Sequence, residues 1–482
     1  MSNLSDLFPA GAGKQVSFTA SGAISSGDAV ILNTDGTAGP IITTQVGSPA
    51  TFESATTELG SSIAFDSSNN KVVIGYRDSG NSGYGTAVVA TVSGSSITYG
   101  TPVVFASAST DGVSGTFDSS NNKVVFAFTD AANSKHGTAI VGTVSGTSIS
   151  FGSEVVFEAD DTRTIAIGFD SSNNKVVIAY RDQNNSLRGT AIVGTVSGTS
   201  ISFGGSSIFE FAQTSNHNVV FDSSNNKIVI CYSDEGNSTY PTAIVGTVSG
   251  SSISFGTAVV ADSNAATRLS ATFDSNSNKV VIGYRDSGNG LYGTAVVGTV
   301  SGTSISFGTK TVFATAESNV RGSAFDTSTN KVTFTFEDGG NSDYGTFVIG
   351  TVSGTSITFD AEQTFETGGA TQYMRVVFDS SANRFVVAYR QTSDNYGKAL
   401  VFSAEPFSNV TTDNFLGIAD EDISDTASGS VTIRGGVSTN VSGLTPNSNY
   451  YVQDDGSLST TSSDVLAGRA LSATSIDVDY ST

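Results

Sequence analysis

The chain has 482 residues, of which 38% are hydrophobic, so it is long enough for more than one domain and too apolar for a disordered tract. Its 44 Asp and Glu against 22 Lys and Arg give a formal net charge of −22, which opposes binding to nucleic acid or anionic membrane over the whole surface. The single cysteine, Cys231, excludes an internal disulfide framework.

The first residues, "MSNLSDLFPAGAGK", lack the charged flank and apolar stretch of a secretory signal, so we expect no signal peptide. No later apolar run is long enough to predict membrane insertion. Residues 1–14 contain Gly and Ala after "LFP", and we expect them to form a flexible anchoring arm. Residues 15–40 alternate in polarity and carry a "DG" hairpin signal, which predicts two strands.

The region that follows is built from an internal repeat. A Phe-Asp pair recurs at successive gaps of 52, 52, 52, 52, 52 and 53 residues, beginning at Phe65, Phe117, Phe169, Phe221, Phe273, Phe325 and Phe378. A constant period of this length is typical of propeller blades.

Each repeat predicts four short strands. In residues 168–205 the strand ending at Phe169 is followed by "KVVIAYR", "GTAIVGTV" and "SISFG", separated by "DSSNN", "DQNNSLR" and "SGT". These runs are rich in Val, Ile, Tyr and Phe and are bounded by turn residues. The sequence therefore predicts an all-β fold, a seven-bladed β-propeller of four-stranded blades.

The last unit lacks its fourth strand, and a substitute stands before the first unit. Residues 41–52, "IITTQVGSPATF", place Gly47 five residues before Phe52, as Gly100 stands five before Phe105. We expect this N-terminal strand to complete the last blade, so that residues 41–404 form a closed ring. The flanking residues 15–40 and 405–482 are then predicted to join into one small, discontinuous β-barrel-like domain that carries the propeller as an insertion.

The amino-acid sequence of the repeat is distinctive. "GTAIVGTVSGTSISFGSEVVF", at residues 137–157, resembles repeats in virion structural, tail-fibre-like proteins of marine bacteriophages, especially phages of cyanobacteria, and "LSDLFPAGAGKQ" and "YYVQDDGSLSTTSSDVLAGRALSAT" resemble the ends of such proteins. "SGDAVILNTDGTA" with "FLGIADEDISDTASGSVTIRGG" also resembles small β-barrels that decorate phage heads. The resemblance implies a location on the outer surface of the virion, with other capsid or tail proteins as partners of the terminal domain and arm.

Candidate ligand contacts lie in the segments that differ between units. The turns "DSSNN" and "VSGTS" are nearly constant and fall on one face, whereas loops after "YRD" and "VVF" are expected on the other face and vary. Arginine there suits a carboxylate or phosphate, although pairing with the adjacent Asp or with a neighbouring blade is the favoured interpretation. The candidates are Arg77, Arg181, Arg285, Arg390, His136, Arg163, His217, Arg268, Arg321, Tyr373 and Arg375.

Other chemistry is less favoured. The "FDSS" turns place oxygens at alternate positions, but turn stabilisation explains them better than calcium, and no metal or cofactor is predicted. Cys231 stands where other units have a small residue, which favours a core position. No catalytic motif is present, and the chain has no Trp for the boxes of sialidase-type propellers. Acidic residues in variable loops, Asp160, Asp161, Asp262 and Glu317, keep a carboxylate pair open.

The sequence therefore predicts a virion surface protein of fibre or decoration type, without catalysis, whose propeller attaches to a host-surface glycan and which acts through many shallow contacts. Two alternatives stay open: a purely structural protein that decorates or cements the capsid, and a virion-associated glycan hydrolase. A homo-oligomer is compatible with each of them.

Overall fold

The computed structural model describes residues 15–58 and 62–479, so the arm predicted at residues 1–14 lies outside the described residues. The described chain divides into two compact units, one of residues 46–404 and one that joins residues 15–45 to residues 405–479. Strands dominate both units, and the only helices in the described part are the single 3-10 turns η1 (Ser79–Asn81), η2 (Glu235–Asn237) and η3 (Gly339–Asn341). None of them is long and apolar enough to cross a membrane. The prediction of an all-β chain is confirmed.

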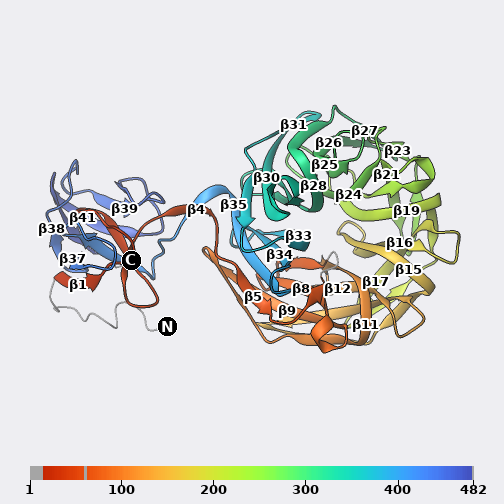
Figure 1. Ribbon diagram of the computed structural model, residues 1–482, viewed down its shortest axis with the longest axis horizontal. Helices are drawn as coiled ribbons and strands as arrows, with labels where there is room; N and C mark the ends of the chain where they lie inside the picture. Colours follow the sequence, from red (N-terminus) through yellow and green to blue (C-terminus); the bar gives the residue numbers. More distant parts are fainter. Residues whose placement is uncertain (1–14, 59–61, 480–482) are drawn as a thin grey trace. The chain divides into compact units, whose positions relative to one another are not determined.

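Residues 46–404 form a ring of antiparallel sheets, seen face-on in Figure 1. The C-terminal half of β15 (Val155–Asp170) pairs with β16 (Lys175–Asp182), and β16 pairs with β17 (Arg188–Ser197). Both β18 (Ser200–Phe203) and the first part of β19 (Ser207–Asp222) then pair with β17. The outer strand of one sheet thus continues directly into the inner strand of the next.

This succession recurs along the chain. The remaining elements of the region are β4 (Thr43–Val46), β5 (Ala50–Glu53), β6 (Thr57–Glu58), β7 (Ile63–Asp66), β8 (Lys71–Asp78), β9 (Tyr84–Ser93), β10 (Ser96–Tyr99), β11 (Val103–Asp118), β12 (Lys123–Asp130), β13 (His136–Ser145), β14 (Ser148–Phe151), β20 (Lys227–Asp234), β21 (Tyr240–Ser249), β22 (Ser252–Phe255), β23 (Val259–Val260), β24 (Ala266–Asp274), β25 (Lys279–Asp286), β26 (Tyr292–Ser301), β27 (Ser304–Phe307), β28 (Thr311–Asp326), β29 (Lys331–Asp338), β30 (Tyr344–Ser353), β31 (Ser356–Phe359), β32 (Gln363–Glu366), β33 (Thr371–Asp379), β34 (Arg384–Gln391) and β35 (Gly397–Ser408).

The repeated turns have the residues that their backbone needs. Each "FDSSNN"-type turn ends in an Asn with positive φ, such as Asn122 at 53° and Asn174 at 53°. The "SGT" turns place Gly in the same region, as at Gly146 with φ 59°. Asn and Gly are the residues that adopt this left-handed conformation at least cost. The turn Asp is also satisfied locally, because Asp170 Oδ1 accepts hydrogen bonds from the backbone N–H groups of Ser172 and Asn173.

The residue that ends each "SISFG" segment has to be glycine because a neighbouring unit leaves no room for a Cβ atom. A Cβ at Gly152 would lie 1.9 Å from the carbonyl oxygen of Thr199, and one at Gly100 would lie 1.8 Å from that of Thr147. The "SGT" turn of the following unit therefore rests directly on this glycine. After the sixth unit the equivalent residue is the exposed Asp360, and the seventh unit has no such turn.

The hydrophobic core lies between neighbouring sheets. Val125 and Val141 of one sheet pack with Val176, Ile178 and Tyr180 of the next in one buried cluster. Similar clusters recur around the ring, so each sheet buries both of its faces against its neighbours.

The predicted loops after "VVF" differ from the structure. In four places the chain from "VVF" to "FD" is a single strand of 16 residues: β11, β15, β19 and β28. Each strand changes register part of the way along, as β15 does between Arg163 and Ala166 where it pairs with β16. A polar segment therefore remains extended because it bridges two sheets and is hydrogen-bonded by both of them.

The first and last strands of the repeat region share a sheet. β5 pairs with β35 through Glu53 with Gly397, Thr51 with Lys398 and Ala50 with Ala399. The backbone N–H of Gly47 donates to Val401 O at 2.8 Å, as Gly152 N–H donates to Val141 O at 2.9 Å in a complete unit.

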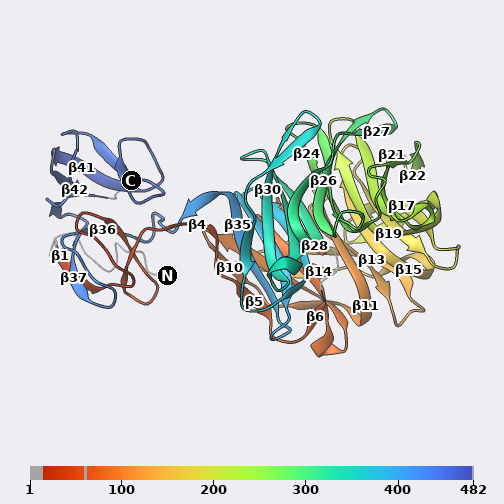
Figure 2. The same cartoon turned by 45° about the horizontal axis from the view of Figure 1, so that its top comes forward.

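The other unit consists of two five-stranded sheets, and Figure 2 shows them apart. The first has the order β1-β37-β36-β2-β3 and the second β38-β42-β41-β39-β40. In the first sheet the two C-terminal strands β37 and β36 lie between the N-terminal strands β1 and β2, where Val16 pairs with Val431 and Val30 with Gly417. The elements are β1 (Gln15–Thr19), β2 (Ala29–Leu32), β3 (Ala38–Pro40), β36 (Phe415–Ala419), β37 (Ser428–Ile433), β38 (Val437–Ser438), β39 (Asn449–Val452), β40 (Leu458–Ser459), β41 (Leu466–Ser472) and β42 (Ser475–Val478).

Candidate functional site

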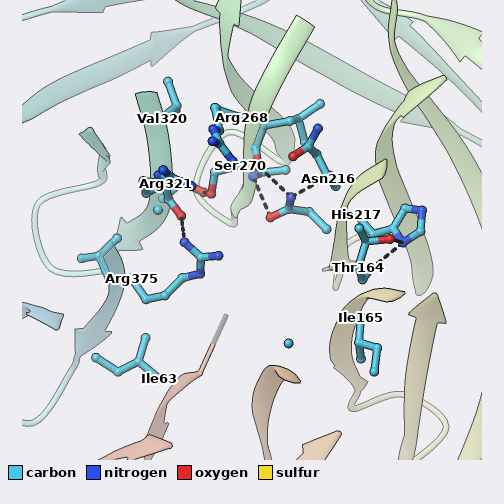
Figure 3. Close-up of a pocket in the computed structure, with 17 residues that line it drawn as sticks. Ile63, Thr164, Ile165, Asn216, His217, Arg268, Ser270, Val320, Arg321 and Arg375 are labelled. Carbon is cyan, nitrogen blue, oxygen red and sulfur yellow. Dashed lines mark hydrogen bonds between the residues drawn. The ribbon is translucent and has the colours of Figure 1, made fainter. Parts of the chain in front are cut away.

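A pocket of about 300 Å³ lies among the inner strands of the ring (Figure 3). We call it the central pocket. Residues of β7, β11, β15, β19, β24, β28 and β33 line it: Ile63, Gly112, Thr164, Ile165, Asn216, His217, Asn218, Arg268, Leu269, Ser270, Ala271, Val320, Arg321, Gly322, Ser323, Arg375 and Val376.

Bulges in the inner strands build this lining. β19 loses register with β20 between Ser215 and Asn218, and β24 loses register with β25 between Thr267 and Ser270. The extra residues have positive φ, with Asn216 at 52° and Arg268 at 54°. A bulge re-aims the side chains at its kink, and bulges are common beside binding sites. The same irregularity recurs in successive units, so the pocket is lined by the positions at which the units differ most.

Polar bonds link neighbouring inner strands at the pocket. His217 Nδ1 lies 2.7 Å from Thr164 O, and the hydroxyl groups of Ser270 and Ser323 lie 2.9 Å apart. Asn218 Nδ2 donates to Leu269 O at 3.0 Å. Each link joins one unit to the next, so the shape of the lining is held by contacts between units.

His217 belongs to this framework. It is 5% exposed, and its Nε2 lies 2.8 Å from the hydroxyl of Thr214. Burial lowers the pKa of His217 to about 4. The ring is therefore neutral near pH 7 and acts as a hydrogen-bonding link.

Three arginines meet at the pocket from successive inner strands: Arg268 on β24, Arg321 on β28 and Arg375 on β33. Arg321 forms a two-point ion pair with Glu337, with Nε–Oε1 2.9 Å and Nη2–Oε2 3.2 Å. Arg375 Nη1 donates to Arg321 O at 2.8 Å. Burial and the neighbouring Arg321 guanidinium lower the pKa of Arg375 to about 9, and the same two causes lower the pKa of Arg268. Burial is the larger cause of both pKa shifts, and the neighbouring positive charge adds to it.

The arginines of the "YRD" segments lie elsewhere and bridge neighbouring units. Arg285 pairs with Glu317 at 2.7 Å, and Arg77 lies 3.8 Å from Asp111 of the following inner strand. Where the segment has no Arg, Thr129 Oγ1 makes an equivalent bridge by donating to Thr162 O at 2.8 Å.

The remaining two "YRD"-type arginines follow the same pattern. Arg181 lies 3.8 Å from Glu235 of the following unit. Arg390 stacks over the Tyr373 ring at 4.8 Å from its centroid and donates to Thr57 O at 3.4 Å. None of the four "YRD"-type arginines lines the central pocket.

The adjacent aspartates proposed as their partners serve the turns. Asp182 Oδ1 accepts from Asn185 N–H at 3.1 Å, and Asp78 Oδ1 accepts from Asn81 N–H at 3.0 Å. Arg163 pairs with Asp161 at 2.9 Å, away from the pocket lining, and His136 begins β13 opposite Asp161. Of the predicted contacts, the structure thus gathers His217, Arg268, Arg321 and Arg375 at one place.

The carboxylates considered for sugar hydrolysis all have other partners. Asp262 accepts from Tyr284 and Lys310, and Asp160 accepts from Asn184 Nδ2 at 2.8 Å. Asp161 and Glu317 hold arginines, as described above. None of the four lines the central pocket.

Metal and thiol chemistry find little support in the described residues. Within residues 15–58 and 62–479 no cluster of three or more His, Cys, Asp or Glu side chains could hold a metal ion. Cys231 is fully buried, and burial raises the pKa of its thiol to about 12. It packs as a small core residue, as predicted.

Sequence reasoning missed the polar residues Thr164, Asn216, Asn218 and Ser270, which form the uncharged part of the lining. Their segments were identified as variable, but a bulge that turns particular side chains inward leaves no clear composition signal. Their position within the repeat could have identified them, because Gly112, Thr164, Asn216 and Arg268 occupy equivalent positions at intervals of 52 residues.

Comparison with known proteins defines the fold. No protein-family model and no curated protein matches the chain. Among solved structures, the BP39L lectin from Burkholderia pseudomallei is 11% identical, with a TM-score of 0.54 over 73% of this chain and 100% of the lectin. The β-propeller domain of Cps50 (Swd1) from Myceliophteria thermophila is 9% identical, with a TM-score of 0.50 over 75% of this chain and 99% of that domain. At such identities the likeness concerns the fold alone: the ring is a β-propeller.

Proposed function

We propose that this protein is a surface component of a bacteriophage particle and attaches, without catalysis, to a host-surface glycan through its propeller. The observation that carries the proposal is the central pocket, whose lining differs from unit to unit on a scaffold of nearly constant turns. The wording of the repeat and of both ends, which resembles phage virion proteins, supports the virion part. The lectin fold neighbour is compatible with a sugar ligand.

The architecture that we propose for this role is a ring of seven blades, closed by the N-terminal strand and inserted into a terminal β-domain. Pairing of β5 with β35 supports the closure, and pairing of β1 and β2 with β37 and β36 supports a discontinuous terminal domain. This domain, with the arm at residues 1–14, would bind capsid or tail proteins.

The proposal is tested with the full chain. Labelled protein should bind host cells and compete with phage adsorption, and a glycan array should identify bound sugars. Antibody labelling of intact particles should place the chain on their outer surface.

Three results would contradict this proposal or favour another function. Particle labelling without any cell or glycan binding would favour a capsid decoration or cement role. Release of sugar from host envelope would favour a hydrolase. Absence of the chain from particles would refute the virion proposal.

A further inference from the structure

The central pocket carries its charge on one side. Figure 3 shows Arg268, Arg321 and Arg375 together, whereas Thr164 and His217 lie across from them. The inner strands β24, β28 and β33 that supply the arginines belong to successive units. The opposite part of the lining comes from β11, β15 and β19, where equivalent bulge positions carry neutral residues.

The positive charge exceeds the negative charge that faces it. Glu337 pairs with Arg321, and within the described residues neither Arg268 nor Arg375 forms an ion pair with a carboxylate. Arg375 Nη1 donates to the backbone carbonyls of Arg321 and Met374 at 2.8 and 2.6 Å, and its buried Nε has no hydrogen-bond partner within the described residues. The Arg268 side chain makes no hydrogen bond within the described residues. The cluster is thus short of acceptors.

This shortage is unusual in a chain whose acidic residues outnumber its basic ones by 44 to 22. The "YRD" arginines Arg77 and Arg285 have carboxylate partners at 2.9 and 2.7 Å. Arg77 and Arg285 are therefore neutralised, whereas Arg268 and Arg375 have no carboxylate ion pair within the described residues. Burial is the main cause of the lowered pKa of Arg268 and Arg375, and the Arg321 guanidinium is the second; a bound anion would stabilise the charged form of both side chains.

We propose that the central pocket binds an anionic substituent of an acidic sugar, a carboxylate, phosphate or sulfate group, between Arg268, Arg321 and Arg375. The planar guanidinium fork matches such groups in two-point hydrogen bonds. A volume of about 300 Å³ is at the lower end for small-molecule sites, which suits one sugar residue at the end of, or along, a chain. The inference rests on the proposed glycan attachment and specifies its ligand class.

The test is calorimetric titration of the full chain with four probes: a neutral oligosaccharide, the same length of uronic-acid oligosaccharide, a sulfated one, and inorganic phosphate. We expect at least one acidic oligosaccharide to bind at least tenfold more tightly than the neutral one. Arg268→Ala should weaken that binding by tenfold or more, and Arg268→Lys should restore part of it because the charge returns without the fork. Since Arg268 has no partner in the described part, its removal leaves no group unpaired.

Arg188→Ala is the matched control. Arg188 also lacks a carboxylate ion pair in the described part, donates to Asn185 Oδ1 at 3.1 Å, stacks on Phe211 at 5.3 Å from its ring centroid and lies outside the pocket lining, so this variant should bind like the wild type. Equal binding of neutral and acidic sugars, or no effect of Arg268→Ala, would overturn the acidic ligand but leave glycan attachment standing. Phosphate bound as tightly as any sugar would overturn it too, as a simple anion site. No carbohydrate binding and no cell labelling would refute the proposed function itself.

Discussion

The hydroxyl of Tyr180 donates to Glu158 Oε2 at 2.8 Å, joining the second strand of one sheet to the outer strand that leads into it. The pair recurs at the equivalent positions of four other units, as Tyr76 with Glu53, Tyr232 with Glu210, Tyr284 with Asp262 and Tyr389 with Glu366. In the two units where the tyrosine is replaced by Phe128 or Phe336, the carboxylate is replaced by Ala106 or Ala314. The tyrosine donor and the carboxylate acceptor are therefore either both present or both absent in a given unit.

This covariation predicts strong coupling between the two side chains. Tyr180→Phe should lower the free energy of unfolding by about 1–2 kcal/mol, because the carboxylate of Glu158 loses its donor. The double variant Tyr180→Phe with Glu158→Ala reproduces the Phe128 and Ala106 pair, and should cost less than the sum of the single variants by about 1 kcal/mol. Urea unfolding of the four proteins measures the cycle. Strict additivity would contradict the coupling.

A second prediction concerns the glycine between neighbouring units. Gly152→Ala should destabilise the fold by about 2–3 kcal/mol, because the new Cβ would lie 1.9 Å from the carbonyl oxygen of Thr199 unless the backbone shifts. Asp360 occupies the equivalent position where the following unit has no "SGT" turn. Asp360→Ala is thus the control and should leave the urea midpoint nearly unchanged. Similar losses for both variants would show that the neighbouring turn is not the cause.

A third prediction is a pH dependence of stability caused by His217. The pKa of His217 in the folded protein, about 4, lies below its ordinary value of 6.5. Between these two values of pH the unfolded chain binds a proton at this histidine, whereas the folded chain does not. Stability from this group is present above pH 6.5 and is lost as pH falls towards 4, by up to about 3 kcal/mol.

His217→Leu should flatten this slope, since Leu269 fills the equivalent place in the next unit. Thr214 would then lose its partner, but the buried hydroxyls of Thr110 and Thr162 already have none among the residues that the structure describes. Unfolding curves at several pH values between 4 and 7 give the measurement. An equal flattening in the control variant His136→Asn would contradict the assignment to His217.

A fourth prediction concerns Cys231. Burial raises the pKa of its thiol to about 12, so a thiol reagent at pH 8 should label the protein only in denaturant. Cys231→Ala should be tolerated, with a loss of less than about 1.5 kcal/mol, because Ala127, Ala179 and Ala388 stand at the same position in other units. Fast labelling of the native protein would contradict this packing role.

Regular features were predictable because a repeat reveals them several times over. Turn residues such as Asn174 and Gly146 have a fixed backbone requirement, so their type alone predicts where strands end. The small size of Cys231 and its equivalents likewise predicted a core position.

The site was only partly predictable, because its geometry depends on bulges rather than on residue type. Arg268 and Arg321 lie within their bulges, whereas Arg375 pairs with Ala388 where the register resumes, and no common spacing marks the three in the sequence. Arg285 and Arg77, which do recur regularly, proved to bridge neighbouring units. In this chain the arginines that recur at equivalent positions have structural roles, whereas the pocket arginines do not recur at equivalent positions.

The pairing of β5 with β35 has a consequence during synthesis. β5 is synthesised at the start of the propeller region and β35 at its end. β5 therefore has no strand to pair with until every intervening unit has been synthesised. Until then β5 keeps an unsatisfied strand edge, which exposes nascent chains to mispairing with one another. Slow translation or crowding on polysomes should therefore reduce the yield of native protein.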